Sequence, residues 1–166
     1  MKKNEKIKLK YSENFYIRAL LNKVKLKEIM VEDPIFLHAD DPFSRVEESF
    51  RKHHIRHLPI VGDNRKLVGI ITQRDLYRIS TPRKDEEGNL VYDKETLDSY
   101  ILKYVMTKDP AVLLPDNTVA EALLLIVDKK YGAIPIVDQH HVLCGIVTQI
   151  DILRFGAQIL REDKAS

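Results

Sequence analysis

The chain carries nearly the same ten letters twice: residues 69–78 read GIITQRDLYR, and residues 145–154 read GIVTQIDILR. The second stretch begins 76 residues after the first, since 145 minus 69 is 76. The same offset, without a gap, relates further pairs of identical residues: Met30 and Met106, Asp40 and Asp116, Pro59 and Pro135. Because internal repeats decide an architecture, we interpret the chain as a tandem duplication of one unit.

The offset bounds two repeat units, residues 24–79 and 100–155, and leaves three other segments. We expect a basic tail with a short helix at 1–23, a charged linker that runs into a helix at 80–99, and a C-terminal tail at 156–166. A unit of about 55 residues is marginal alone, because a small domain buries too little of its surface. We therefore expect the two units to pack against each other and share a core.

Each unit is expected to form a strand, a helix, a β-hairpin and a second helix. Short apolar runs at 35–37 and 111–114 indicate the first strands, and paired apolar runs around turn-forming residues indicate the hairpins. At the start of the first helix, Asp41 is the predicted N-cap in one copy, and Thr118 with Glu121 forms a predicted capping box in the other. The predicted fold is α/β in the broad sense, an α+β unit of order β-α-β-β-α, doubled as a pseudo-two-fold pair.

Composition argues against several classes of protein. The formal net charge of +2 is too small to indicate a nucleic-acid partner, and the lysine-rich start lacks interleaved aromatic residues. No segment approaches the ~20 apolar residues of a membrane span, and none resembles a signal peptide. The single cysteine, Cys144, cannot form an internal disulfide. We therefore expect a reducing, cytoplasmic setting and no membrane.

Two short patterns, Thr-x-x-Asp, recur in the two copies: Thr72 with Asp75, and Thr148 with Asp151. One interpretation is a helix cap, in which the hydroxyl and the carboxylate satisfy amides at the helix start. The other interpretation is a ligand site. Free amides at a helix N-terminus suit a phosphate, and a carboxylate can accept hydrogen bonds from the paired hydroxyls of a ribose.

The stretch at 53–59, HHIRHLP, allows three interpretations. His53 and His57 have the i, i+4 spacing of metal ligands on a helix, but no cysteine or nearby acidic residue completes a ligand set. The stretch also suits a solvated, basic helix end. Finally, Arg56 and His57 can both donate hydrogen bonds to an anion, which favours contact with a phosphate.

The second copy differs at these positions, because Gly132 and Ala133 replace the Arg-His pair and Ile150 replaces Arg74. Gly132 has no side chain, so the backbone there can approach a flat base closely. Lys108 is a candidate anion contact in this copy. We therefore expect two unequal clefts, one rich in phosphate partners and one more apolar that suits a nucleoside face.

The order of these motifs, repeated in one register, resembles a pair of cystathionine-β-synthase (CBS) domains, often called a Bateman module. The matching stretches are IMVEDPIFL and VMTKDPAVLL, HIRHLPIV and YGAIPIVD, and GIITQRDL and GIVTQIDI. The resemblance covers about 24 to 155. It implies a non-catalytic regulatory module that binds AMP, ADP, ATP or S-adenosylmethionine between the domains. It also implies a homodimer, often a flat disc of four domains, and a regulated protein that the sequence does not identify.

The resemblance also implies roles for single residues: the Thr and Asp of each Thr-x-x-Asp pattern contact the phosphate and the ribose. Regulatory subunits of AMP-activated kinases carry a phosphate-binding His-Arg pair where this chain has Arg56-His57, in reversed order. The candidate nucleotide-binding residues are Ile35, Arg56, His57, Leu58, Pro59, Thr72, Arg74, Asp75, Lys108, Asp109, Pro110, Gly132, Ala133, Ile134, Pro135, Thr148 and Asp151.

We predict no catalytic residue, no metal ligand and no required cofactor, and the rest of the chain leaves no room for a catalytic or membrane domain. The alternative function is a structural dimerisation module without a physiological nucleotide, in which the Thr-x-x-Asp patterns only cap helices. An enzyme ranks third, because no nucleophile–base pair is visible in the sequence. Nucleic-acid binding ranks fourth.

Overall fold

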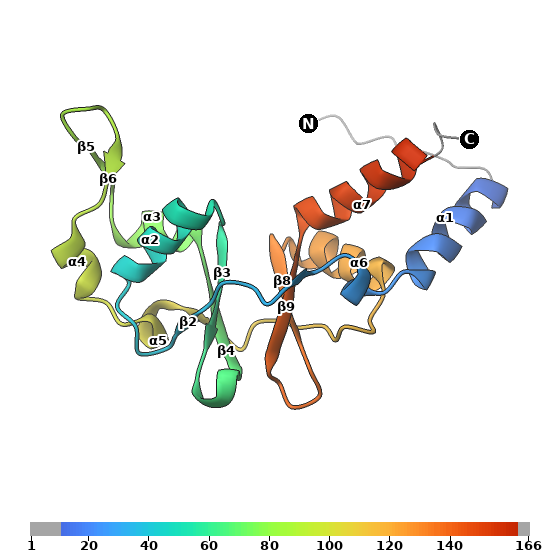
Figure 1. Ribbon diagram of the computed structural model, residues 1–166, viewed down its shortest axis with the longest axis horizontal. Coiled ribbons are helices and arrows are strands. Elements are labelled where there is room, and N and C mark those ends of the chain that lie inside the picture. The colour runs from blue at the N-terminus through green and yellow to red at the C-terminus, as the bar shows by residue number, and fades with distance from the viewer. Residues whose placement is uncertain (1–10, 163–166) are drawn as a thin grey trace.

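The computed structural model describes residues 11–162, which form two lobes side by side along the long axis of the molecule (Figure 1). One lobe holds a four-stranded sheet of order β2-β3-β4-β7, and the other holds a three-stranded sheet of order β1-β9-β8. Helices α2 and α3 lie in the first lobe, and α6 and α7 lie in the second (Figure 1). The mixed α and β fold predicted from the sequence is confirmed.

The elements follow the repeated order that the offset predicts. The first unit contains β1 (Val31–Glu32), β2 (Leu37–His38), α2 (Ser44–His53), β3 (His57–Val61), β4 (Leu67–Thr72) and α3 (Gln73–Ile79). The second unit contains α5 (Leu102–Val105), β7 (Thr107–Lys108), α6 (Val119–Lys129), β8 (Ala133–Val137), β9 (Leu143–Thr148) and α7 (Gln149–Glu162). The other elements are α1 (Tyr11–Lys23), the short 3-10 turns η1 (Leu26–Glu28) and η2 (Asp63–Arg65), the hairpin of β5 (Arg83–Lys84) and β6 (Leu90–Val91), and α4 (Lys94–Asp98).

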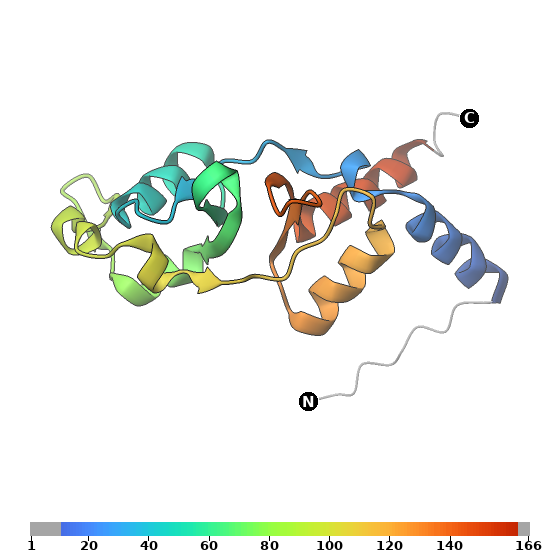
Figure 2. The same ribbon diagram turned by 90° about the horizontal axis from the view of Figure 1, so that it is seen from below.

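The first strand of each unit pairs with the sheet of the other unit. β1 runs antiparallel to β9, with Val31 opposite Ile146, and β7 runs antiparallel to β4, with Thr107 opposite Ile70. The two pairings are equivalent under the offset of 76. The chain therefore crosses between the lobes twice, at opposite edges of the molecule (Figure 2).

The leading segments of the two units, residues 24–32 and 100–108, carry core side chains into the opposite lobe. Leu26 is fully buried in the core of the second lobe, and Leu102 is fully buried in the core of the first. Equivalent backbone hydrogen bonds hold them there: Leu26 N to Asn117 O at 2.8 Å, and Leu102 N to Asp41 O at 3.1 Å. Each lobe core is thus completed by residues from the other unit.

A pseudo-two-fold axis runs between the two hairpins. Lys66 and Val142 occupy equivalent positions in the repeat, and they pair with each other in an isolated β-bridge. Pairing of equivalent positions is what a two-fold relation produces. Next to this bridge, one apolar cluster joins both hairpins: Val61, Leu67, Val137 and Leu143. The predicted shared core is this cluster, which lies between two larger lobe cores.

Several local features differ from the sequence predictions. Asp41 does not cap α2, because its carboxylate accepts hydrogen bonds from His38 N at 2.8 Å and from Arg45 at 2.7 Å, and the helix begins only at Ser44. The strand expected at 35–37 is reduced to β2, at Leu37–His38, since the chain at 33–36 is crossing between lobes. The strand expected at 111–114 forms only an isolated bridge, between Leu113 and Ile136. The capping box of Thr118 and Glu121 is confirmed.

Other helices also depart from the expected bounds. The helix expected where the linker leads into the second unit is interrupted between α4 and α5, where Tyr100 O accepts a hydrogen bond from Phe43 N. The last helix, α7, continues past Phe155 to Glu162. Within residues 11–162, no helix combines the length and apolar character needed to cross a bilayer. The basic start of the chain, residues 1–10, lies outside the described residues.

Candidate functional site

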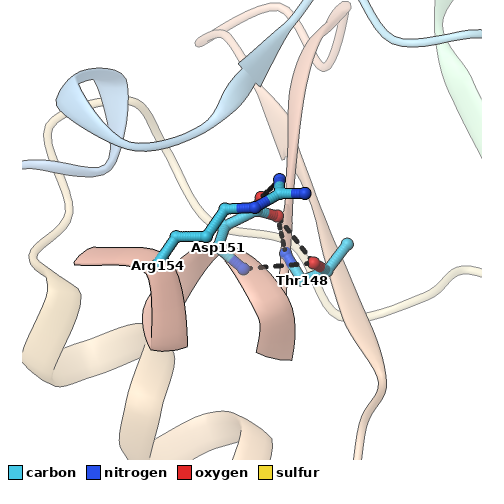
Figure 3. A network of polar contacts seen from close by, with 3 residues as sticks. All are labelled: Thr148, Asp151 and Arg154. Carbon is cyan, nitrogen blue, oxygen red and sulfur yellow. Dashed lines mark hydrogen bonds and ion pairs between the residues drawn. The ribbon is translucent and has the colours of Figure 1, made fainter. Parts of the chain in front are cut away.

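Both Thr-x-x-Asp patterns form the same closed cap where a strand passes into a helix. Oδ2 of Asp75 accepts hydrogen bonds from N and Oγ1 of Thr72, both at 2.8 Å. Oδ2 of Asp151 accepts them from N of Thr148 at 2.8 Å and from its Oγ1 at 2.6 Å (Figure 3). The helix-cap interpretation therefore describes these residues in the structure. One carboxylate oxygen of each Asp remains outside the cap.

That second oxygen, Oδ1, faces an arginine one helical turn later. Arg154 Nη1 lies 3.2 Å from Oδ1 of Asp151 (Figure 3), whereas Arg78 Nη1 lies 3.7 Å from Oδ1 of Asp75. The side chain of Asp75 is 15% exposed and that of Asp151 only 6%. Oδ1 of Asp75 is thus the more accessible acceptor. The sequence reasoning missed both arginines, although the Asp-x-x-Arg spacing in both copies places them on one helix face.

The first amides of these helices are occupied within the protein, contrary to the sequence expectation of free donors. Gln73 N donates a hydrogen bond to Arg56 O at 3.0 Å, and Gln149 N donates one to Gly132 O at 3.2 Å. The threonine amides already bind the aspartate carboxylates. These four amides are therefore not available to an anion.

Three basic side chains gather where β3 begins, next to the Thr72 cap. His57 is half-buried on β3 and lies opposite Thr72 of β4 in the sheet register. Burial lowers the pKa of His57 below its ordinary value, and the positive charges of Arg56 and Arg74 lower it further. Arg56 and Arg74 are themselves exposed. An anion bound between these donors would relieve the repulsion among the three groups.

The metal interpretation of the histidines does not fit the structure. Helix α2 ends at His53, and His54 takes the left-handed conformation, with φ of 53°. His57 then lies on a strand, so it does not share a helix face with His53. Across residues 11–162, no group of three or more His, Cys, Asp or Glu side chains is arranged to hold a metal ion.

His57 reaches across the boundary between the lobes to Gly132. A Cβ at Gly132 would overlap the imidazole of His57, so the glycine is what allows this close approach. The sequence singled out these positions because they distinguish the two copies. The structure brings them into contact, and it thereby joins the basic cluster of the first lobe to the second lobe.

The remaining candidates lie in the core or next to the crossings. Several are buried strand residues: Leu58, Pro59, Ala133, Ile134 and Pro135. Of these, Leu58 and Ile134 belong to the lobe cores. Ile35 is 41% exposed where the chain crosses from the second lobe to the first. Lys108 pairs with Gly69 of β4 and precedes Asp109 and Pro110. Lys108 belongs to the second copy, but the exchange of first strands places it on the sheet of the first lobe.

An open groove of about 720 Å³ lies in the first lobe, away from these candidates. Charged residues of α2 and α4 line it, among them Arg45, Glu48, Arg51 and Lys94. The sequence reasoning did not anticipate this groove, because it depends on how α4 packs against α2.

The sequence matches the CBS domain model twice, over residues 26–81 and 102–158. It is 33% identical over 130 residues to inosine-5'-monophosphate dehydrogenase of Methanocaldococcus jannaschii, covering 78% of this chain and 23% of the dehydrogenase. The chain thus spans less than a quarter of the length of that curated relative, and 23% of an L-aspartate semialdehyde sulfurtransferase from the same organism.

Two solved structures share the fold. The CBS domain of a CBS-domain-containing membrane protein from Sphaerobacter thermophilus is 25% identical, with a TM-score of 0.69, covering 87% of this chain and 97% of that one. The CBS domain pair of protein MJ0100, in complex with 5'-methylthioadenosine and S-adenosyl-L-methionine, is 27% identical, with a TM-score of 0.66, covering 81% and 98%. Two copies of the CBS model account for more than half of the sequence, and the chain belongs to the CBS-domain family as a tandem domain pair.

Proposed function

We propose that the chain is a non-catalytic regulatory module that senses an adenosine-containing ligand in the clefts between its two CBS domains. The observation that carries this proposal is the cluster of Arg56, His57 and Arg74 next to the cap formed by Thr72 and Asp75. The cluster supplies donors for a phosphate, and Oδ1 of Asp75 supplies an acceptor for a ribose hydroxyl. The candidate ligands are AMP, ADP, ATP and S-adenosylmethionine.

The relatives support the adenosine class of ligand. The CBS domain pair of MJ0100 was solved with two adenosine-containing molecules, and this chain matches nearly the whole of that pair. The relatives that carry enzyme names are much longer than this chain, so their names give no reason to assign it a reaction. The single cysteine supports a reducing compartment such as the cytoplasm.

The two clefts would hold different parts of such ligands. We assign the phosphate groups of AMP, ADP or ATP to the cluster in the first lobe, with Lys108 as a further cation on that lobe. The second lobe presents Gly132, Ala133 and Ile150 at the equivalent positions. That side suits a nucleoside face or S-adenosylmethionine, which has no phosphate to neutralise.

Binding would act on the contact between the lobes. An anion at Arg56 and Arg74 favours the protonated form of His57 and so changes how its ring packs against Gly132. A ligand shifts such an equilibrium only by its differential affinity for the two arrangements. We expect the chain to act as a homodimer and to pass this change on to a regulated protein. No feature of the chain identifies that protein.

A second candidate function is a structural dimerisation module without a physiological nucleotide. The closed caps favour it, because the Thr-x-x-Asp residues satisfy each other without any ligand. In this case the duplication serves the architecture alone, and none of the adenosine ligands binds.

Calorimetry with AMP, ATP, S-adenosylmethionine and adenosine separates the two functions. The proposal expects Asp75→Asn to weaken binding by roughly 10- to 150-fold, since hydrogen bonds to a charged group contribute ~1.5–3 kcal/mol. Glu121→Gln is the matched control, because Glu121 closes the same kind of cap on α6, away from the cluster. It should cost some stability and leave affinity unchanged. Binding of none of the four ligands would establish the structural module instead.

A further inference from the structure

The crossing segment, residues 33–36, carries the chain from the second lobe to the first (Figure 2). Asp33 N donates a hydrogen bond to Cys144 O at 3.3 Å, which fixes the start of the segment to the second lobe. The end of the segment leads into β2, which pairs with β3 of the first lobe. The backbone of the crossing segment is therefore attached to both lobes.

Ile35, inside this segment, lies at the edge of the basic cluster. Strands β2 and β3 run parallel with Leu37 opposite Ile60, so the same register continued two residues back places Ile35 beside Leu58, which follows His57. Ile35 is 41% exposed, and it belongs to none of the core clusters formed by the described residues. An exposed apolar side chain next to polar donors suits the flat face of a nucleobase.

Arg65, in the turn between β3 and β4, holds the residues on both sides of Ile35. Its guanidinium pairs with the carboxylate of Asp33, and it lies over the ring of Phe36, 4.9 Å from the ring centroid. Phe36 in turn packs against the apolar cluster between the hairpins. We call these two contacts of Arg65 the Arg65 clamp.

Stability alone does not account for the Arg65 clamp. The carboxylate of Asp33 is 81% exposed, and an exposed ion pair contributes little to stability. Nε of Arg65 is buried without a hydrogen-bond partner among the described residues, which is unfavourable for a donor. The backbone of Arg65 is also left-handed, with φ of 60°, a conformation that is uncommon for residues other than glycine.

The second copy lacks the clamp, although its turn has nearly the same backbone. Under the offset of 76, His141, with φ of 65°, replaces Arg65, and Val112 replaces Phe36. The carboxylate is retained as Asp109, but no ion pair or hydrogen bond joins it to His141 in the part of the chain that the structure describes. The clamp is therefore particular to one crossing and is not required by the shared fold.

We propose that Arg65 is a positioning residue for the cleft of the first lobe, where it fixes Ile35 against the base of an adenosine ligand. This inference deepens the proposed function and rests on it. Arg65 itself does not touch the ligand, because it acts through Asp33 and Phe36. A crossing segment that is already held in place need not be ordered when the ligand binds, and such preorganisation raises affinity.

Calorimetry with adenosine and AMP tests the positioning role. Arg65→Gln should weaken the binding of both ligands by the same factor, roughly 3- to 10-fold, because Ile35 faces the base that they share. Arg45→Gln is the matched control, since it removes the same charge from another ion pair of the first lobe, with Asp41, and should leave both affinities unchanged. A loss confined to AMP would make Arg65 a phosphate contact and overturn the proposal.

A double-mutant cycle tests whether Arg65 acts through Ile35. Ile35→Ala should weaken adenosine binding roughly 10-fold, because it removes apolar surface that the base covers. In the Ile35→Ala background, Arg65→Gln should have no further effect on affinity. Additive losses would show that Arg65 acts through another residue. A variant that loses stability in denaturant and keeps its affinity would show a purely structural role, and either result contradicts the proposal.

Hydrogen exchange tests the clamp without a ligand. In Arg65→Gln the amide of Asp33, which is bonded to Cys144 O, should exchange faster than in the wild type. The equivalent amide of Asp109, bonded to Val68 O at 3.4 Å, is the internal control and should keep its rate. Unchanged exchange at Asp33 would show that Arg65 does not hold the crossing segment.

The same measurements keep this inference separate from the sensor. If the wild type binds AMP and Arg65→Gln binds it equally well, the positioning role is removed and the sensor stands. If the wild type binds none of the adenosine ligands, the sensor is removed and the positioning role falls with it.

Discussion

The imidazole of His57 in the first lobe packs against Gly132 in the second, where one copy of the repeat has Arg56-His57 and the other has Gly132-Ala133. The contact links the cationic cluster to the opposite lobe through one half-buried ring. Variants should reveal both how much this contact stabilises the fold and how the protonation of His57 affects it.

Gly132→Ala should lower the free energy of unfolding by ~1–3 kcal/mol, because a Cβ would overlap the ring of His57 and force it to move. Denaturant unfolding measures the change. Gly156→Ala is the matched control, since Gly156 lies inside α7 with open space around it. There alanine should stabilise the helix by about 0.5–1 kcal/mol. His57→Ala should relieve the cost of Gly132→Ala, and failure of that rescue would place the strain elsewhere.

The stability of the protein should fall in mild acid partly because of His57. Its pKa is lowered in the folded state, so the neutral imidazole is the form that folding favours. The stabilisation is complete above the ordinary histidine pKa of ~6.5 and is lost as the pH falls through that value toward the lowered one. His57→Gln should flatten the dependence of stability on pH between pH 7.5 and 5.5. Parallel curves for the two proteins would contradict this assignment.

The exchanged leading segments should make the stability of each lobe depend on residues that belong to the other unit of the repeat. Leu102→Ala should cost ~2–5 kcal/mol, because Leu102 is fully buried in the first lobe. Hydrogen exchange should then show β3 and β4 losing protection before β8 and β9. Leu26→Ala should give the reverse pattern. Loss confined to the lobe of the mutated unit's own hairpin would argue against the exchange in solution.

Arg56→Ala should discriminate between ligands by their phosphate. We expect AMP and ATP to bind roughly 10- to 150-fold more weakly, since a charge-assisted hydrogen bond contributes ~1.5–3 kcal/mol, whereas adenosine should bind unchanged. Arg51→Ala is the control, because Arg51 is an exposed arginine on α2, outside the cluster. Calorimetry on both variants measures the effect. An equal loss for adenosine and AMP would remove Arg56 from the phosphate assignment.

The repeat made most of the fold predictable. Hairpins, helices and the pseudo-two-fold relation all follow from alternation, helical spacing and one constant offset, as the bridge between Lys66 and Val142 confirms. The exchange of leading segments between the lobes could not be predicted from the repeat. An offset states that two copies are equivalent, but a strand such as β1 has the same sequence whether it pairs within its own unit or with β9 of the other.

The candidate site was predictable in part. The Thr-x-x-Asp spacing predicts the cap geometry, because those bonds are local to one helical turn. The approach of His57 to Gly132 joins positions 75 residues apart, since 132 minus 57 is 75, and it depends on how the lobes dock. The position of Lys108 on the sheet of the first lobe could not be predicted from the sequence for the same reason. Local sequence patterns predict hydrogen bonds within one helical turn. Contacts between the two units can be placed only once the fold is known.

Because each lobe is completed by a segment of the other unit, a single unit of this repeat has an incomplete core and an unpaired sheet edge. Two separate units could complete each other's cores by exchanging their leading segments, which would form a domain-swapped dimer. In the present chain the segment at 80–98 links the two units covalently. Their exchange is therefore intramolecular and does not depend on the protein concentration. Severing that segment would turn an intramolecular fold into a binding equilibrium between two halves.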